Sequence, residues 1–181
     1  MGQTIINLVF FGVQTMKIDL RTLKLHPGKY ENFELEYQGN NELLGDQGVF
    51  LDPVKVSLQV HNHGDYFSAR GVVETRVALT CSRCLETLIW PISAQANFII
   101  AEELKEIMNQ LDEDFLVYGS GLVDIEPIIG EYLVTELPFT PVCREDCQGL
   151  CPVCGGNRNE KSCSCGNDDI DPRWEKLKNF K

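Results

Sequence analysis

Residues 143–166 read CREDCQGLCPVCGGNRNEKSCSCG, and this stretch decides how the C-terminal part of the chain can fold. Its six cysteines follow the pattern C-x3-C-x3-C-x2-C-x8-C-x-C, and its only large apolar residues are Leu150 and Val153. A segment with so little apolar surface to bury cannot fold by hydrophobic burial alone. Metal binding by cysteine thiolates can supply the missing folding free energy, so the stretch predicts a structural metal site.

Two further cysteines lie upstream, in the motif CSRC at residues 81–84. Eight cysteines make two sets of four, and four thiolates complete one closed tetrahedral zinc site. We therefore predict two structural Zn²⁺ ions, the first of which ties the tail to the CSRC turn. The predicted ligands are Cys81, Cys84, Cys143 and Cys147 in the first site, and Cys151, Cys154, Cys163 and Cys165 in the second.

Three alternatives for the cysteines stay open. Cys147 can instead join the second site, which leaves Cys143 or Cys163 without a metal. Disulfides can use the same residues, although no secretion signal is recognised and thiols of intracellular proteins stay reduced. The motif CPVCG at residues 151–155 is similar to the iron-binding turns of rubredoxin, which keeps a redox iron site as a further possibility.

The part before the tail has the residue pattern of a β-sheet. Apolar and polar residues alternate over residues 33–37, 54–60, 71–79 and 88–100, as in strands with one buried face. Short connections between them predict an antiparallel meander or barrel-like sheet. The sequence HNHGD at residues 61–65 is rich in turn-forming residues, and we interpret His61 and His63 as part of a turn rather than of a nuclease motif.

Helices are predicted after the strands. Apolar residues at helical spacing favour a helix near residues 124–137, capped by Asp124 and ending before Pro138, which packs on the open sheet face. Residues 101–111 favour a short second helix, and residues 173–181 a basic terminal helix. The fold class is α+β: one or two helices pack on the sheet, and a zinc-knuckle module with a short terminal helix follows.

The domain organisation follows from these patterns. The apolar residues 1–15 are interpreted as an N-terminal extension, because Met16 opens a segment that looks like a natural beginning. Residues 16–142 form the predicted β-rich core, and residues 143–181 the zinc-binding tail with the C-terminal helix. No apolar stretch is long enough to span a bilayer, so no membrane partner is expected.

The charge restricts the partners. The chain has 16 Lys and Arg against 27 Asp and Glu, a formal net charge of −11 at pH 7. Such a chain repels a phosphate backbone over most of its surface, whereas it attracts basic proteins. Direct RNA contact has to be local. The candidate residues for it are Arg83, Arg144, Arg158, Lys161, Arg173, Lys176 and Lys178.

No catalytic pattern is recognised in the sequence. It contains no Ser-His-Asp arrangement that we can place, no phosphate-binding glycine loop and no dinucleotide motif. Two closed sets of four cysteines also leave no open metal position for a substrate. We therefore expect a non-enzymatic protein without a small-molecule substrate.

Several short motifs together carry a family resemblance. They are TCSRCLE at residues 80–86, LPFTPVC at 137–143, DCQGLCPVCGGNRNE at 146–160, the trailing C-x-C, and DPRW at 171–174. In this combination the chain resembles the YceD family of large ribosomal RNA subunit accumulation proteins from Met16 to its end. The resemblance implies a factor for the synthesis, processing or stability of 23S ribosomal RNA, in the bacterial cytoplasm or the plastid stroma. It implies no catalytic residues.

Resemblance and charge together lead to three hypotheses. The first is a zinc-stabilised scaffold that binds a basic ribosomal protein or an rRNA-processing factor. The second is a direct RNA-binding zinc-knuckle module, whose affinity would fall steeply with salt. The third is a rubredoxin-like iron redox protein, which the metal itself would reveal.

Overall fold

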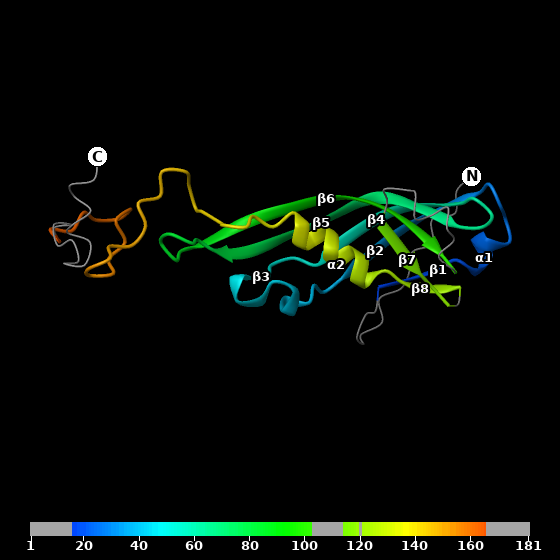
Figure 1. The fold of residues 1–181 in the computed structure, drawn as a ribbon, viewed down its shortest axis with the longest axis horizontal. Coiled ribbons are helices and arrows are strands. Elements are labelled where there is room, and N and C mark those ends of the chain that lie inside the picture. Colours follow the sequence, from blue (N-terminus) through cyan, green and yellow to red (C-terminus); the bar gives the residue numbers. More distant parts are fainter. Residues whose placement is uncertain (1–15, 103–113, 120, 166–181) are drawn as a thin grey trace, which may run out of the picture. The chain divides into compact units, whose positions relative to one another are not determined.

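The computed structural model describes residues 16–102, 114–119 and 121–165 (Figure 1). The chain divides into two compact units. The first comprises Met1–Leu79 and Ile89–Phe139, and the second comprises Thr80–Leu88 and Thr140–Lys181. The predicted N-terminal extension, most of the helix predicted at 101–111 and the predicted terminal helix at 173–181 lie outside the described residues.

The first unit is built on one large sheet. Its strands pair in the order β2–β4–β5–β6–β7, and the short strand β3 pairs with β5. Their bounds are β2 (Tyr30–Tyr37), β3 (Gly48–Phe50), β4 (Val54–Asn62), β5 (Phe67–Thr80), β6 (Thr87–Ala101) and β7 (Asp114–Val117). A separate two-stranded sheet joins β1 (Lys17–Asp19) to β8 (Leu122–Asp124). The helices are α1 (Arg21–Lys24) and α2 (Glu126–Thr135), with 3-10 turns η1 (Asn41–Leu43) and η2 (Gly45–Gln47).

Strand β4 forms where the alternating pattern predicts it. Its four apolar residues Val54, Val56, Leu58 and Val60 are at most 2% exposed, while the residues between them face outward. It pairs antiparallel with β2 on one side and β5 on the other. Opposite Leu58 lies Gly71, where a Cβ atom would come within 1.8 Å of the Ser57 carbonyl oxygen. A glycine is therefore required at this close approach of two neighbouring strands.

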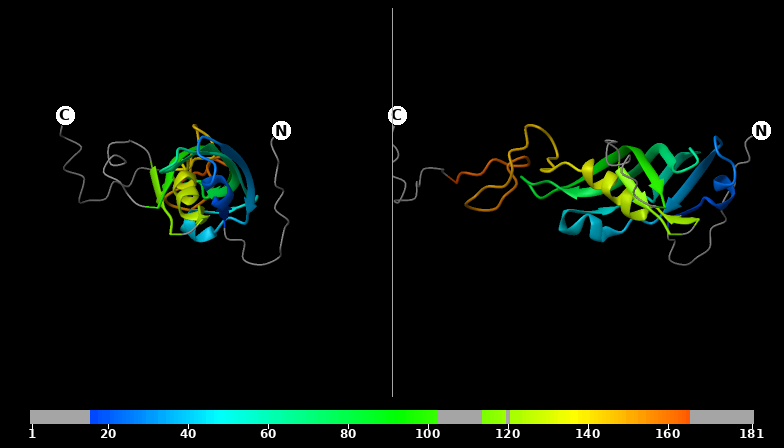
Figure 2. Two further views of the ribbon diagram at one scale, coloured as in Figure 1. Left: turned by 90° about the vertical axis from the view of Figure 1, so that its right-hand side faces the viewer. Right: turned by 45° about the vertical axis from the view of Figure 1, so that its right-hand side comes forward.

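Helix α2 lies inside the curve of the sheet (Figure 2). Its apolar residues Ile128, Ile129 and Leu133 are buried. The Tyr132 hydroxyl lies 2.7 Å from the carbonyl oxygen of Asn97 on β6 and 2.6 Å from a carboxylate oxygen of Asp114 on β7. The helix begins at Glu126, whose backbone N–H donates to Asp124 Oδ1, and ends at Thr135, before Pro138. The predicted packing helix is thus present.

The α+β class is confirmed, but two details of the predicted sheet are wrong. Strand β7 runs parallel to β6, so the sheet is not a purely antiparallel meander. Among the described strands the sheet is open, because its end strands β2 and β7 do not pair with each other, and no closed barrel forms. Helix α2 covers the inner face of the sheet, so the apolar side chains of that face are buried without closure of the sheet into a barrel.

The turn after β4 is held by a buried asparagine. Asn62 is fully buried, its Nδ2 donates to the Leu23 carbonyl at 2.8 Å, and its Oδ1 accepts from the Gly64 N–H at 2.7 Å. Because successive side chains of a strand point to opposite faces, His61 and His63 lie on the other side. The predicted turn is present at residues 63–66, but β4 continues through His61 to Asn62, so the prediction that His61 belongs to the turn is wrong.

No helix in the described ranges is long and apolar enough to cross a membrane.

Candidate metal centre

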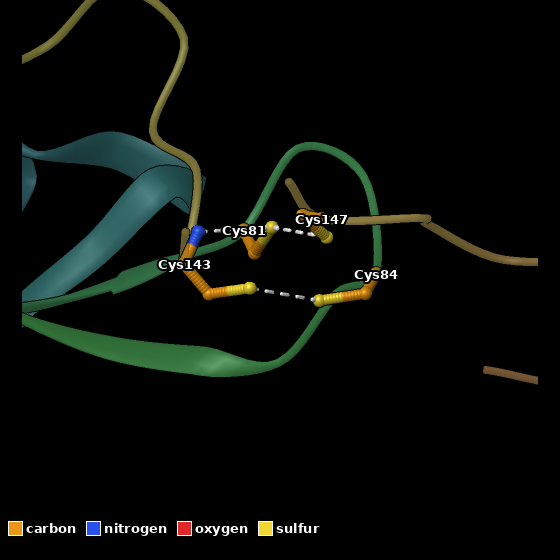
Figure 3. A group of neighbouring side chains, drawn as sticks. All are labelled: Cys81, Cys84, Cys143 and Cys147. Carbon is orange, nitrogen blue, oxygen red and sulfur yellow. Dashed lines mark hydrogen bonds between the residues drawn. The ribbon is translucent and has the colours of Figure 1, made fainter. Parts of the chain in front are cut away.

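The second unit joins the CSRC turn to the cysteine-rich tail (Figure 3). Residues 81–86 connect β5 to β6 and carry Cys81 and Cys84, whereas Cys143 and Cys147 belong to the tail. The four Sγ atoms lie within 4.8 Å of one another. Cys81, Cys84 and Cys147 are buried, and Leu88 and Val142 pack against them.

The sulfur spacing of this first tetrad fits a tetrahedral metal ion. The Sγ atoms of Cys81 and Cys147 are 3.9 Å apart, and those of Cys84 and Cys143 are 3.6 Å apart. Four sulfurs placed about 2.3 Å from a zinc ion form a tetrahedron with edges of about 3.8 Å. The same distances are far too long for disulfides, whose sulfurs are about 2.05 Å apart. The geometry thus suits metal ligation by thiolates.

The second tetrad has the same composition. Its members lie within 4.8 Å of one another and are Cys151, Cys154, Cys163 and Cys165. The two groups have the membership that the sequence analysis assigned to its two sites, with Cys147 beside the first, and metal ligation by them stays a prediction. Cys151 is buried and Cys154 is exposed, so the second tetrad lies nearer the surface than the first.

The two C-x2-C turns share one backbone conformation. The Leu85 N–H donates to the Cys81 carbonyl at 3.0 Å, and the Gly155 N–H donates to the Cys151 carbonyl at 2.9 Å. The residue after each second cysteine is left-handed, with φ of 62° at Leu85 and 71° at Gly155. Glycine adopts this conformation freely, whereas leucine is strained in it. Each tetrad is therefore anchored by a knuckle-like turn that is tight enough to require a left-handed residue.

Protonation also favours a cation in the first tetrad. Burial raises the pKa of the Cys81 thiol, but the backbone N–H groups of Cys84, Arg83 and Cys143 outweigh it and bring the pKa down to about 6. A backbone N–H of Glu86 lowers the pKa of Cys84, but burial and the neighbouring cysteines raise it to about 12. The pKa of Cys147 is lowered as well, whereas that of Cys143 is raised, so the site ionises in part and resists the loss of all four protons. A bound divalent cation would remove that resistance.

The second tetrad behaves in the same way. Backbone N–H groups of Cys154 and Val153 lower the pKa of Cys151 to about 6. The adjacent Cys154 sulfur, followed by burial, raises the pKa of Cys165 to about 12. In both tetrads the pKa of one thiol is lowered to about 6 and that of another is raised to about 12, so a complete set of thiolates requires positive charge between them.

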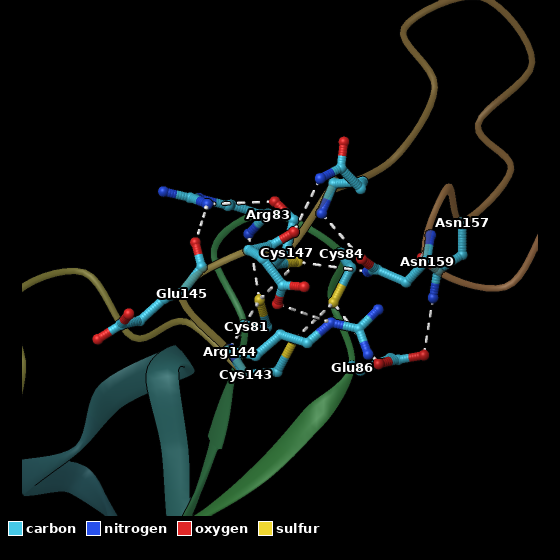
Figure 4. Close-up of polar contacts among 12 residues, drawn as sticks. Cys81, Arg83, Cys84, Glu86, Cys143, Arg144, Glu145, Cys147, Asn157 and Asn159 are labelled. Atoms are coloured by element: carbon cyan, nitrogen blue, oxygen red, sulfur yellow. Dashed lines mark hydrogen bonds and ion pairs between the residues drawn. The ribbon is translucent and has the colours of Figure 1, made fainter. Parts of the chain in front are cut away.

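Residues around the first tetrad fix the tail to the CSRC turn (Figure 4). The Arg83 guanidinium donates through Nη1 to the carbonyl oxygens of Glu145 and Cys147, at 3.1 Å each. The Arg83 carbonyl accepts from the Leu150 N–H at 3.0 Å. Gly149 makes this approach possible, because a Cβ there would lie 2.9 Å from the same carbonyl oxygen. Arg83 therefore holds the tail through both its backbone and its side chain.

Two asparagines complete the surroundings. Asn159 donates from Nδ2 to the Cys147 sulfur at 3.3 Å, and this bond is the largest cause of the lowered pKa of Cys147. Asn157 donates from Nδ2 to Glu86 Oε1 at 2.7 Å. The Asn159 bond is an outer-shell contact of the kind that orients a ligand and stabilises its thiolate, whereas Asn157 contacts a carboxylate beside the tetrad. The sequence reading missed both asparagines, although the run NRN at residues 157–159 lies beside the cysteines.

The basic residues predicted to touch RNA have different surroundings. Arg83 is bonded to backbone carbonyls of the tail, as described above. Arg144 lies 3.5 Å from the Asp146 carboxylate in an exposed ion pair. Arg158 and Lys161 are exposed. Arg173, Lys176 and Lys178 lie outside the described residues.

Comparison with known proteins identifies the family. The family model "Large ribosomal RNA subunit accumulation protein YceD" matches residues 69–181, which contain all eight cysteines. The chain belongs to the YceD family. The predicted resemblance is therefore confirmed.

Relatives of this YceD-family chain occur in bacteria and plants. It is 32% identical over 181 residues to an uncharacterized protein of Mycobacterium tuberculosis. This alignment covers 90% of the present chain and 79% of the relative. It is 26% identical over 156 residues to the chloroplastic "Large ribosomal RNA subunit accumulation protein YCED homolog 1" of Arabidopsis thaliana, covering 71% of this chain and 49% of the relative. The maize protein of the same name is 28% identical over 142 residues, covering 62% and 48%. No solved structure shows a significant match to the chain.

Proposed function

We propose that the protein supports the accumulation of large-subunit ribosomal RNA as a zinc-stabilised scaffold that binds a basic protein. The observation that carries this proposal is the YceD family match together with two all-cysteine tetrads inside the matched residues. The partner is a basic ribosomal protein or an rRNA-processing factor. The place of action is the bacterial cytoplasm, or the plastid stroma in a plant-type host.

Zinc is the metal that suits these tetrads best. Four cysteine ligands at tetrahedral spacing are typical of structural zinc sites, which are closed to substrates. The role is then non-enzymatic, because a closed site offers no position for a reacting water or substrate. An iron site in a rubredoxin-like redox protein is the competing assignment, and it would be coloured whereas zinc is colourless.

A protein partner suits the charge better than a bare RNA surface. The formal net charge is −11, and metal ligation by thiolates would make the second unit no more positive. In that unit Arg83 and Arg144 already bond to carbonyl and carboxylate oxygens. Exposed Arg158 and Lys161 remain as the described candidates for RNA contact, against exposed Glu145, Asp146 and Glu160.

A complementation experiment tests this function. Cells that lack their YceD-family protein receive the wild-type chain, Cys84→Ser, or Ser82→Ala, which changes an exposed residue of the same turn. We expect the wild type and Ser82→Ala to restore the ratio of 23S to 16S rRNA, and Cys84→Ser to fail. Restoration by Cys84→Ser, in a protein shown to have lost metal, would contradict the scaffold proposal.

A crosslinking experiment separates the partners. The wild-type protein is crosslinked in cells, by a protein-reactive reagent in one arm and by ultraviolet light in the other. We expect a basic protein in the first arm and little RNA in the second. RNA crosslinks centred on Arg158 and Lys161, with no protein partner, would favour the direct RNA-binding module instead.

A further inference from the structure

The outer face of the large sheet carries a pocket that the metal centres do not use. It lies in the first unit and has a volume of about 380 Å³. Its walls come from the end of β4, the following turn, the start of β5 and the end of β6. The lining residues are Gln59, His61, His63, Tyr66, Ser68, Arg70 and Ile99.

Strand register brings these side chains together. Gln59 lies opposite Arg70 and His61 lies opposite Ser68 on the antiparallel strands β4 and β5. Since Asn62 turns inward, both neighbouring histidines face the pocket side. Ile99 is only 1% exposed and packs with Tyr66 and Phe115, so it forms an apolar floor. Small-molecule pockets combine apolar and aromatic side chains with a few polar groups that orient the ligand, and this pocket contains both kinds, with polar side chains in the majority.

The polar walls suit an oxyanion. The His63 Nε2 atom lies 3.0 Å from His61 Nδ1 and 2.9 Å from Ser68 Oγ. Arg70 donates from Nε to Asn97 Oδ1 at 3.1 Å, which fixes a permanent positive charge at the wall. None of the described lining residues is acidic, although the chain as a whole has a net charge of −11. Arg70 is a donor, and the Ser68 hydroxyl and the histidine rings can donate or accept, so the group is better suited to a phosphate than to a metal cation, which Arg70 would repel.

The pKa of His63 responds to its burial and to the charges around it. Burial lowers the pKa of His63, and the positive charges of His61 and Arg70 lower it further. Those two groups would instead attract a bound phosphate, which would stabilise the protonated imidazole. A phosphate bound in the pocket would therefore oppose the lowering of the His63 pKa.

Aromatic rings beside the donors point to more than a bare phosphate. The His63 and Tyr66 rings stack at a centroid distance of 4.7 Å and an angle of 17°. Tyr30 lies opposite His61 on strand β2 and is 61% exposed. Nucleic-acid bases stack on such exposed aromatic side chains of a sheet. A volume of about 380 Å³ also exceeds what one phosphate group fills.

We propose that this pocket binds one nucleotide unit, with the phosphate at Arg70 and the histidines and the base over the aromatic and aliphatic side chains. The nucleotide comes either from a free mononucleotide or from an RNA chain. The inference goes beyond the proposed scaffold function, because it needs neither the tetrads nor a protein partner.

Histidine NMR on the wild-type protein tests the site directly. The chain has three histidines, and His26 is exposed and does not line the pocket, so it serves as an internal control. Separate samples are titrated with AMP, with inorganic phosphate and with a single-stranded RNA hexamer. We expect saturable shifts of the His61 and His63 ring signals below about 1 mM AMP, with no shift of His26.

The three ligands give distinct outcomes. Stronger binding of the hexamer than of AMP identifies RNA as the source of the nucleotide, and equal binding identifies a free mononucleotide. Inorganic phosphate that binds as tightly as AMP would overturn the nucleotide assignment. Absence of histidine shifts with both AMP and the hexamer would overturn the site altogether.

A matched pair of variants adds a second test. Arg70→Gln removes the charge from the pocket wall, whereas Arg76→Gln removes a charge on the same strand outside the pocket. We expect Arg70→Gln to weaken AMP binding at least about tenfold and Arg76→Gln to leave it unchanged. Thermal unfolding and metal content are measured on both variants. Equal AMP affinity of folded Arg70→Gln and wild type would contradict the proposal without affecting the scaffold function.

Discussion

The two units of this chain are ordered by different forces. In the first unit, strands such as β4 and helix α2 bury aliphatic side chains between a sheet and a helix. In the second unit, the residues of the buried cluster described around the first tetrad are cysteines, with Leu88 and Val142 packed beside them. Hydrophobic burial needs no ligand, whereas an all-cysteine cluster is stable as thiolates only around a cation. The units should therefore respond to different perturbations.

Metal removal should have the largest effect, and it should be confined to the second unit. Structural zinc contributes roughly 10–16 kcal/mol to the folding of small zinc-binding peptides at pH 7. We expect a chelator, or Cys84→Ser, to collapse the amide NMR dispersion of residues 140–165 while the sheet signals persist. Loss of the sheet signals together with those of the tail would show that the two units are not separately ordered.

A substitution in the hydrophobic core should destabilise the first unit and leave the metal content of the second unit unchanged. Phe98 on β6 is fully buried, whereas Phe139 is fully exposed. We expect Phe98→Ala to lower the free energy of unfolding of the first unit by about 3–5 kcal/mol, because it leaves a cavity. Phe139→Ala serves as the control and should change it by less than about 0.5 kcal/mol. Denaturant unfolding measures both, and elemental analysis should find unchanged metal in each. Metal loss in Phe98→Ala would contradict the separation.

Arg83 should give an intermediate effect on the second unit. Its side chain donates to two tail carbonyls, whereas Arg144 makes only an exposed ion pair. We expect Arg83→Gln to destabilise the metal-bound tail by about 1–2 kcal/mol and to speed metal loss to a competing chelator. Arg144→Gln should change the metal-transfer rate little. Equal rates for the two variants would mean that the Arg83 bonds do not hold the tail, and would free Arg83 for the predicted RNA contact.

Leu85 should give the smallest effect, and a stabilising one. Leucine is strained at its φ of 62°, and glycine occupies the equivalent position, Gly155, in the other turn. Relief of this strain would stabilise the folded state by about 1–2 kcal/mol. Glycine also has more conformational freedom in the unfolded chain, which offsets a part of that gain. We expect Leu85→Gly to raise the stability of the metal-bound turn by up to about 1 kcal/mol, measured by thermal unfolding. A clear loss of stability would show that the exposed Leu85 side chain makes a contact that outweighs the strain.

The sequence predicts those parts of the molecule whose pattern is local. Strands β4, β5 and β6 are long enough for their alternation to be read, and the spacing of the cysteines leads to the two tetrads. Strands β1, β3, β7 and β8 have three or four residues each, which is too short for a period. The parallel pairing of β7 with β6 depends on tertiary packing, and the residues of β7 do not predict it.

Features that depend on pairing between distant residues could not be predicted. His61 and His63 have the sequence of an ordinary turn, and only the register with Ser68 and Arg70 makes them walls of a pocket. Arg83 reads as a free surface cation, because nothing in its neighbours shows that carbonyls 62 and 64 residues away accept its hydrogen bonds. Long-range polar contacts of this kind leave no periodic trace in a sequence.

Metal content is the measurement that tests the central claim most directly. The native protein is purified without chelators, its metals are determined by elemental analysis, and its reactive thiols are titrated on the same sample. Two closed tetrads predict about two zinc ions per chain and few reactive thiols, because all eight cysteines then ligate metal. Iron in place of zinc, or no metal together with disulfides, would contradict the account of the second unit.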